Sequence, residues 1–428
     1  MRSFARWLCP NARLDRLHHK QSAESRARPH RHAPDRERPG LLAVSSIEQS
    51  PYPLVFRVDP DSFTANHLAP TAAQSRIRVQ ARPLAGMQKE AIVQYGPTGA
   101  IWRIVCDEGP WLNGTDLAPF PLAFFTAGLA AGFLSDYMAE ALARMVPITG
   151  LEIHQDNFFS MEGSALKGTM AAKADEVNIG FIAEGDASRH ELAEIGRTAV
   201  CERSVANAIL QDSLSSMFAL TVNDERISPA NVTSAQLFDR ADPRELFDRC
   251  SPDTDFSQAD DIIKKVTTPA QGATTNPAVG LQASQKRQVH VATHGRVRTD
   301  GLKEIAVQCI QPAGSRFVFL SDESEDSGGQ GRAPNGMTWL SCGVAFCFMT
   351  QIGRYAAIAK KELDDYRIVQ DIGFIPAGEH TPSASPVSTL VCLDTAEPIS
   401  ECEKLVQMGE QTCYLHAACR TPTEVRLN

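Results

Sequence analysis

The stretch that decides the fold is SDESEDSGGQGRAPNGMTWLSCGVAFCF at 321–348, because CDEGPWLNGTDLAPFPLAFFTAGLAAGF at 106–133 repeats its plan. The Asp-Glu pair, a glycine, the Ala-Pro pair and the closing Phe recur at a constant offset of 215 positions. A fixed self-match of this length indicates a duplicated structural unit. The copies differ at one chemically important position, since Cys347 in the second corresponds to Gly132 in the first.

The bulk composition is that of an ordinary globular protein with two to three domains. The chain has 428 residues, of which 43% are hydrophobic and 22% charged. A formal net charge of -9 gives no general reason to bind nucleic acid or an anionic membrane. The longest uncharged stretches, 117–135 and 333–352, are close to the length of a membrane span. Because both are rich in small residues, we expect buried core helices and no membrane partner.

The hydrophobic pattern divides the chain into four parts. Residues 1–48 are basic and poor in aliphatic side chains, which predicts a disordered extension. Residues 49–220 and 287–428 form the two copies, and 221–286 have the polar composition of a linker. Each copy reads as strands, a long apolar helix, more strands and a final helix. The expected fold class is therefore α+β, with an antiparallel sheet and a buried central helix in each unit.

The cysteines and histidines show no ligand spacing along the chain. Eleven cysteines lack the spacing of a disulfide framework or a zinc site, and no signal peptide is evident. We therefore expect a reducing, cytoplasmic compartment. No HxxH or HExxH pattern joins the histidines, and no phosphate-binding glycine motif opens a helix. The sequence predicts neither a metal site nor a cofactor.

The ordered motifs in both copies resemble the OsmC/Ohr superfamily of thiol-dependent hydroperoxide reductases. The residues that carry the resemblance are the two quoted stretches, GEQTCYL at 409–415, and the segment EGDASRHELAEIGRTAVCERSVANAIL at 184–210. The resemblance covers about 75–215 and 286–425. It implies two units packed as an intramolecular pseudo-dimer, with a degenerate first copy.

The resemblance also implies a two-cysteine site in the second copy. Cys347 would be the nucleophile and Cys413 the resolving thiol, with Cys342, Cys402 and Cys419 as neighbouring competitors. A deeply placed thiol needs a cation to ionise. The family's strand arginine matches Arg296 in THGR at 293–296, with Arg298 as the alternative. In the first copy, Cys201 stands at the second-cysteine position.

The first copy is expected to be catalytically silent, because Gly132 replaces the nucleophile. The acid that family members carry soon after the proline is absent from both copies, and Glu323 or Glu325 could replace it from the preceding turn.

The implied function is reduction of organic hydroperoxides, with a dithiol or lipoylated protein as reductant. Two readings of Cys347 remain open. Free cysteine is usually a small buried hydrophobe. The alternative function is accordingly a non-catalytic protein of this fold that binds an apolar ligand, or that senses oxidants through Cys347.

Overall fold

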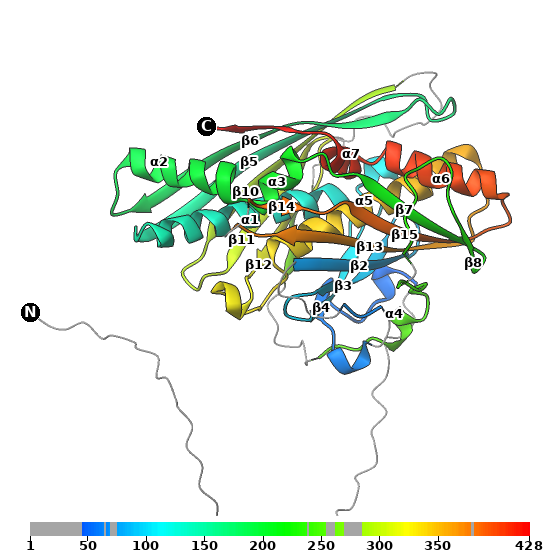
Figure 1. The fold of residues 1–428 in the computed structure, drawn as a ribbon, viewed down its shortest axis with the longest axis horizontal. Helices are drawn as coiled ribbons and strands as arrows, with labels where there is room; N and C mark the ends of the chain where they lie inside the picture. Colours follow the sequence, from blue (N-terminus) through cyan, green and yellow to red (C-terminus); the bar gives the residue numbers. More distant parts are fainter. Residues whose placement is uncertain are drawn as a thin grey trace, which may run out of the picture. The chain divides into compact units, whose positions relative to one another are not determined.

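The computed structural model describes residues 45–63, 66–68, 75–237, 239–253, 262–268, 285–377 and 381–428. The described elements belong to one compact unit, Pro39–Asn428. Most of the predicted N-terminal extension and part of the predicted linker lie outside the described residues. The fold is α+β, with two mixed sheets and long helices between them (Figure 1).

The first sheet has the strand order β1-β4-β3-β2-β13-β15-β7-β8, and β14 pairs with β13. Its pairs are antiparallel except β15 with β7, which are parallel. Its strands are β1 (Val55–Arg57), β2 (Ser75–Pro83), β3 (Lys89–Tyr95), β4 (Ala100–Cys106), β7 (Ser216–Val222), β8 (Glu225–Ile227), β13 (Asp365–Ile375), β14 (Ser383–Ala384) and β15 (Val387–Asp394).

The second sheet has the order β16-β6-β5-β10-β11-β12-β9. It is antiparallel except for β16 and β6, which are parallel. Its strands are β5 (Ile148–Gly163), β6 (Ala171–Gly185), β9 (Ile263–Thr267), β10 (Gln285–Val297), β11 (Lys303–Gln311), β12 (Arg316–Ser321) and β16 (Glu424–Leu427).

Both sheets take strands from both halves of the chain. In the first sheet β2 of the first half pairs with β13 of the second, and in the second sheet β5 pairs with β10. The sequence pattern predicted a sheet within each unit. It identified strands by their period of two, but this period does not specify which strand becomes the partner. Pairing across the halves satisfies backbone groups that would otherwise form open edges.

The two long helices, α1 (Pro121–Ala143) and α5 (Gly336–Ala359), lie between the sheets (Figure 1). Helix α1 packs on the second sheet and α5 on the first, and the helices contact each other. A Cβ atom on Gly128 would stand 2.5 Å from the carbonyl oxygen of Gly336, and one on Gly343 would stand 2.7 Å from the backbone nitrogen of Phe125. These two glycines are needed for the close approach of the helices.

Both helices are long and apolar enough to cross a membrane by length and composition, but 72% of the apolar window of each is buried inside the structure. That placement is the one expected for core helices. Most of their buried residues are apolar, as a helix enclosed on most sides requires. The buried polar residues include Thr126 and Glu140 of α1 and Thr338, Ser341, Thr350 and Gln351 of α5.

The predicted second helix of each copy is broken in the structure. In the first half, α2 (Arg189–Thr198) continues into a π-helical turn η4 (Ala199–Arg203), and α3 (Val205–Gln211) begins anew after Ser204. In the second half, α6 (Ile399–Gln411) ends and α7 (Tyr414–Arg420) begins after Cys413. Ser204 and Cys413 are the N-caps of these short helices. The side chain of each accepts a hydrogen bond from a backbone N–H three residues on.

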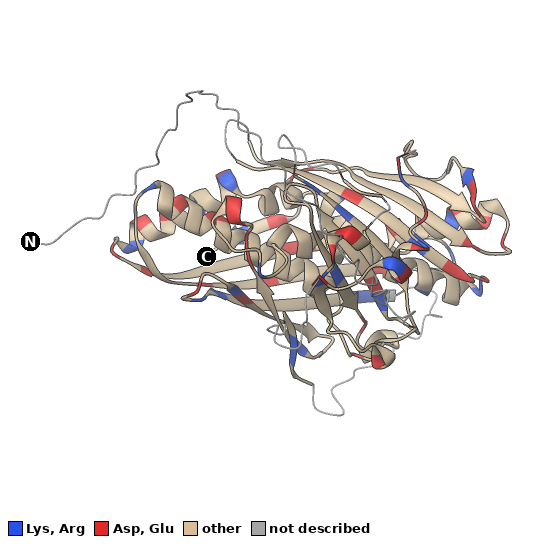
Figure 2. Cartoon of the chain, turned by 90° about the horizontal axis from the view of Figure 1, so that it is seen from below, with Lys and Arg blue, Asp and Glu red and all other residues tan. Residues whose placement is uncertain are grey.

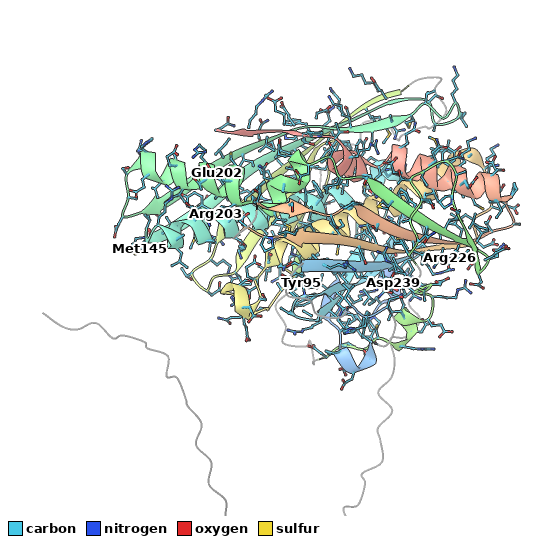
Figure 3. The ribbon with its side chains drawn as sticks, viewed as in Figure 1. Tyr95, Met145, Glu202, Arg203, Arg226 and Asp239 are labelled. Carbon is cyan, nitrogen blue, oxygen red and sulfur yellow. The ribbon has the colours of Figure 1, made fainter. Side chains whose placement is uncertain are left out.

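The segment expected to be a linker contributes structure where it is described. It holds β8, β9 and a short helix α4 (Leu246–Arg249). Leu237 and Phe247 are buried against the first sheet and its edge, so a polar segment is fixed by a few apolar anchors. Arg226 donates to the carbonyl oxygen of Leu237 (2.9 Å), and Asp239 stands 3.3 Å from Arg78 of β2 (Figure 3).

Charged side chains of both signs are interspersed over the described chain (Figure 2). Some of them are buried as pairs. Arg78 of β2 lies 2.8 Å from Asp371 of β13, which joins the two halves across the first sheet. The remaining short helices are η1 (Ile47–Gln49), η2 (Pro60–Ser62), η3 (Pro110–Leu112) and η6 (Glu325–Ser327).

Candidate functional site

Two buried thiols meet in the structure. Cys347 lies on α5 with 3% of its surface exposed, and Cys413 lies fully buried at the start of α7. The side chains of the two cysteines interact, since Cys347 contributes to the pKa shift of Cys413. Burial raises the pKa of Cys413 far above its usual range, and contact with Cys347 raises it further. All described cysteines are reduced. The break between α6 and α7 is what brings Cys413 to the face of α5.

A histidine supports the second thiol. The backbone N–H of His416 donates to Cys413 Sγ (3.4 Å), and its ring Nδ1 lies 3.3 Å from the same sulfur. Burial lowers the pKa of His416 to about 3, so this imidazole is neutral at physiological pH. The ring packs against Phe218 and Phe348, with centroids 6.0 and 5.0 Å away. His416 can exchange a hydrogen bond with the thiol without carrying charge.

Arg354 is half-buried and supplies positive charge near Cys347, and the half-buried Arg287 interacts with Arg354. Arg354 stands seven residues after Cys347 on α5, two helical turns on and on the same face. It interacts electrostatically with Arg287, Tyr414, Glu108 and Cys347. Burial lowers the pKa of Arg354 and of Arg287, and the neighbouring Arg287 lowers that of Arg354 further. Guanidinium groups nevertheless remain charged in proteins.

The acid of the site comes from the first half of the chain. Glu108 follows β4, is only 3% exposed, and accepts a hydrogen bond from Thr350 Oγ1 of α5 (2.6 Å). Burial raises the pKa of Glu108, while Lys89, Thr350 and Arg354 act in the opposite direction. The expectation that Glu323 or Glu325 would serve Cys347 from the preceding turn is therefore wrong. Glu108 stands in the turn of the first copy that corresponds to the turn holding Glu323 in the second.

Arg296 does not lie at the thiols. Its side chain is 54% exposed and bonds Glu304, with Nη2 and Oε1 2.8 Å apart. Thr293 and Gly295 of β10 face the core, so Arg296 points to the outer face of the sheet. The alternative, Arg298, pairs with Asp300 at 3.0 Å in the following turn. The same alternation places Arg287 on the inner side, and this period of two was the signal that could have identified it.

The other cysteines are placed differently. Cys342 is buried on α5, where burial raises its pKa well above the usual value. Cys402 is bonded to the carbonyl oxygen of Glu397, while Cys419 of α7 lies near Cys347. Cys201 is exposed in the π-helical turn. In the first half the N-cap of the comparable short helix is Ser204, and Cys201 stands three residues before it.

A second, similar arrangement surrounds Gly132. Ser135 Oγ donates to Glu323 Oε1 (2.6 Å), and Lys303 Nζ lies 3.1 Å from the same oxygen. Asp136 stands next to this group, and burial raises its pKa to about 7 against the hydrogen bond from Ser204. A Cβ on Gly132 would come within 3.1 Å of Met337 Cε. This site has carboxylates and hydroxyls but no thiol among the residues just named.

Comparison with known proteins gives a weak likeness to a solved structure. No family model matches the chain, and no curated protein matches it. Among solved structures, one match is the crystal structure of an OsmC-like hydroperoxide resistance protein from Jannaschia sp. CCS1. The identity is 22% over 29% of this chain and 81% of that chain, with a TM-score of 0.17. A likeness of this extent carries no argument about the fold or the function of this chain.

Proposed function

We propose that the chain reduces organic hydroperoxides by a two-cysteine mechanism, with Cys347 as the nucleophile and Cys413 as the resolving thiol. The observation that carries this proposal is the interaction between two buried thiols, one of which also interacts with the half-buried Arg354. Removing an arginine from solvent costs free energy unless its charge is compensated. Charged side chains are therefore not expected around cysteines that serve only as hydrophobic core residues.

The proposed reaction has two covalent steps. The Cys347 thiolate attacks one oxygen of the peroxide, forming an S–O bond while the O–O bond breaks, and the alcohol leaves with a proton. Cysteine is thereby oxidised to sulfenic acid. The sulfur of Cys413 then attacks the sulfenic sulfur and releases water, leaving a Cys347–Cys413 disulfide. A dithiol, such as a lipoylated protein, returns two electrons and two protons and restores both thiols.

The buried charges have separate roles in this proposal. Arg354 and Arg287 stabilise the thiolate of Cys347, because an adjacent cation favours the ionised form. Glu108 balances the guanidinium charge and holds α5 through Thr350. The raised pKa of Cys413 keeps that sulfur protonated until Cys347 is oxidised. The predicted role of Arg296 passes to Arg287, nine residues earlier on the same strand and on its inner face.

We further propose that the two halves form an intramolecular counterpart of a homodimer. The strands shared between both sheets and the glycine-lined contact of α1 with α5 support this proposal. Glu108 supports it most directly, because the first half supplies an acid to the thiols of the second. The first half is then needed for catalysis without holding a nucleophile. We place the protein in a reducing, cytoplasmic compartment, where dithiol reductants are available.

The test is peroxide consumption by the purified full chain with cumene hydroperoxide and dihydrolipoamide. Cys347→Ser should abolish turnover, and Cys413→Ser should consume one equivalent of peroxide and then stop. Cys342→Ser is the matched control, because it removes a buried thiol from the same helix and should retain activity. Turnover that survives Cys347→Ser, with a folded variant verified by circular dichroism, would refute the proposed nucleophile.

A second candidate function is favoured by the 3% exposure of Cys347. A thiol so enclosed suits a sensor that is oxidised once and recycled slowly, or a non-catalytic protein of this fold that binds an apolar ligand. Titration of thiols after one equivalent of peroxide separates these outcomes. A sensor loses two thiols without steady turnover, and a non-catalytic binder loses none.

A further inference from the structure

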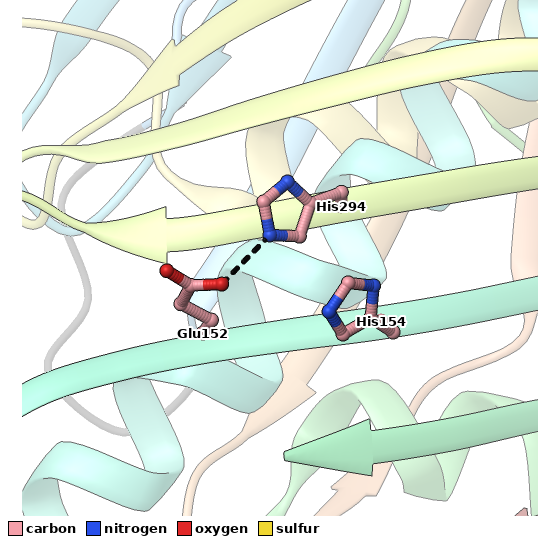
Figure 4. A group of neighbouring side chains, drawn as sticks. All are labelled: Glu152, His154 and His294. Atoms are coloured by element: carbon pink, nitrogen blue, oxygen red, sulfur yellow. Dashed lines mark hydrogen bonds and ion pairs between the residues drawn. The ribbon is translucent and has the colours of Figure 1, made fainter. Parts of the chain in front are cut away.

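A cluster of three possible metal ligands lies on the outer face of the second sheet, where the two halves of the chain pair. Glu152 and His154 stand two residues apart on β5, and His294 is directly opposite His154 on β10 (Figure 4). The ligand atoms of all three lie within 4.8 Å of one another. His294 Nε2 and Glu152 Oε2 are 3.0 Å apart, and the two imidazole rings stack with centroids 4.6 Å apart.

The surrounding positions leave room above this cluster. Across the sheet, His154 is flanked by Gly180 of β6 and His294 by Ala306 of β11. A Cβ on Gly180 would meet nothing within 4 Å. The histidine pair therefore has the smallest side chains on both sides, on a face open to solvent. An incoming ion could keep water ligands there.

We propose that Glu152, His154 and His294 bind a divalent transition-metal ion, with Zn²⁺ as the best match. Two imidazoles and one carboxylate are a common set of zinc ligands when water completes the coordination. Zinc–nitrogen and zinc–oxygen bonds of about 2.0–2.2 Å require the ligand atoms to draw together to about 3.3 Å. Rotation about the side-chain torsions of these solvent-facing residues achieves that without moving the strands.

The nearby charges set the strength of the site. The hydrogen bond from His294 lowers the pKa of Glu152, with smaller contributions from His154 and Arg296. Arg296 opposes a cation, but its guanidinium is held by Glu304. An exposed site with three protein ligands therefore exchanges its ion readily. Because β5 and β10 come from opposite halves, the bound ion would fasten the halves together.

The sequence pattern predicted no metal site because it considered spacing along the chain only. His154 and His294 are 140 positions apart and become neighbours through the pairing of β5 with β10. Such a site appears only once the register of the sheet is known.

The experiment is isothermal titration of the full chain with ZnCl₂, repeated with CoCl₂ to follow the absorption of the bound cobalt. His18, His19, His30 and His32 near the N-terminus are first replaced by Ala, so that their own binding of metal does not mask the site. In this background we expect one equivalent of Zn²⁺ to bind. His154→Ala, His294→Ala and Glu152→Gln should each weaken binding at least tenfold.

The matched control is His290→Ala. His290 lies four residues along the same face of β10 and pairs with Asp156 at 2.6 Å, outside the cluster. Its replacement should change the affinity less than twofold. Absence of Zn²⁺ binding in the background chain, or an equal loss with His290→Ala, would overturn the proposal. Glu152→Gln keeps the size of the side chain and the strand pairing. A loss of Zn²⁺ affinity in this variant therefore reports on the missing ligand rather than on folding.

Discussion

The environments of Cys347 and Gly132 are built alike and differ in the groups that do chemistry. Around Cys347, Thr350 donates to Glu108. Around Gly132, Ser135 donates to Glu323, with the same 2.6 Å separation. A lysine of the neighbouring strand, Lys89 or Lys303, interacts with each glutamate. The hydroxyl, the acid and the lysine thus recur in both halves.

The groups that differ are the thiols and the guanidinium. The 215-position offset aligns Cys347 with Gly132 and Arg354 with Ala139. Ser204 takes the place of Cys413 as a helix N-cap. The comparison teaches that the polar trio recurs in both halves, whereas the two sulfurs and Arg354, to which we assign the proposed reaction, occur at these positions in one half only.

The surface next to each trio differs as well. Trp111 packs against the hairpin between β11 and β12, where a Cβ on Gly314 would come 2.6 Å from its ring. The same offset aligns Trp111 with Asp326. Asp326 and Tyr95 line a pocket of about 480 Å³ (Figure 3). The surroundings of Gly132 are the more open of the two at this position.

The largest expected effect on activity comes from replacing Arg354, whose counterpart in the other half is Ala139. Arg354→Gln should lower kcat/KM by about thirtyfold, because loss of a charged partner costs about 2 kcal/mol of stabilisation. Arg354→Lys should recover part of the loss. The rate of Cys347 alkylation by iodoacetamide should fall in Arg354→Gln while the free energy of unfolding stays unchanged, a combination that a purely structural role would not give. Arg296→Gln is the control and should stay within twofold. An equal loss from Arg296→Gln would restore the arginine predicted from the sequence.

The helix contact offers the largest expected effect on stability, as distinct from activity. Gly128→Ala should reduce the free energy of unfolding by about 3 kcal/mol, because its Cβ would stand 2.5 Å from backbone atoms of α5. Gly132→Ala should change it by less than about 1 kcal/mol. Its Cβ would meet side-chain atoms at 3.1 and 3.2 Å, and alanine also favours the helix. Urea denaturation measures both. Similar losses at the two positions would show that the helices do not depend on a backbone-to-backbone approach at Gly128.

Much of this fold was predictable from local pattern. The apolar runs after Ala118-Pro119 and Ala333-Pro334 predicted helices at about 122–145 and 337–363, and the structure has them at Pro121–Ala143 and Gly336–Ala359. The composition of the sheets was not predictable. Strand pairing joins residues hundreds of positions apart, and one sequence carries no signal of partner choice.

The site was predictable only in part, for the same reason. Cys347 and Cys413 came from a resemblance, and the structure places them in contact. Glu108 was missed because it reaches the site from the other half. Arg287 was missed for a different reason. The family's motif pointed to Arg296, while the alternation of Val289 and Val291 with polar residues puts Arg287 on the inner face.

An acid near Gly132, Asp136, predicts a dependence of stability on pH. The folded-state pKa of Asp136 is raised from 3.8 to about 7, so the folded state binds its proton more tightly than the unfolded state. The stabilisation from this group is present below pH 4 and is lost as the pH rises through 7. The side chain in Asp136→Asn cannot ionise. The free energy of unfolding of this variant, minus that of the original chain, should therefore rise by about 2 kcal/mol between pH 4 and pH 8, after allowance for partial exposure.

The measurement for Asp136 is urea denaturation at several pH values. The corresponding position on α5 is Gln351, which carries no charge, so the Cys347 half should show no such dependence from this position. Asp224→Asn, at a carboxyl that is 74% exposed, is the control and should follow the original chain at every pH. A constant difference between Asp136→Asn and the original chain would mean that Asp136 ionises normally in the folded state.

The smallest expected effect comes from changing the corresponding glutamate in each half. This comparison separates a role in stabilising the fold from a role in catalysis. Glu108→Gln and Glu323→Gln each keep an oxygen that can accept from Thr350 or Ser135 and remove one negative charge beside a lysine. Both should therefore lose a similar free energy of unfolding, about 1 kcal/mol. Only Glu108 lies in the field of Arg354, so only Glu108→Gln should lower kcat/KM, by about tenfold. Glu323→Gln should stay within twofold. Equal losses of activity would mean that the trio acts through the stability of the fold in both halves, and that Glu108 has no separate part in orienting the guanidinium.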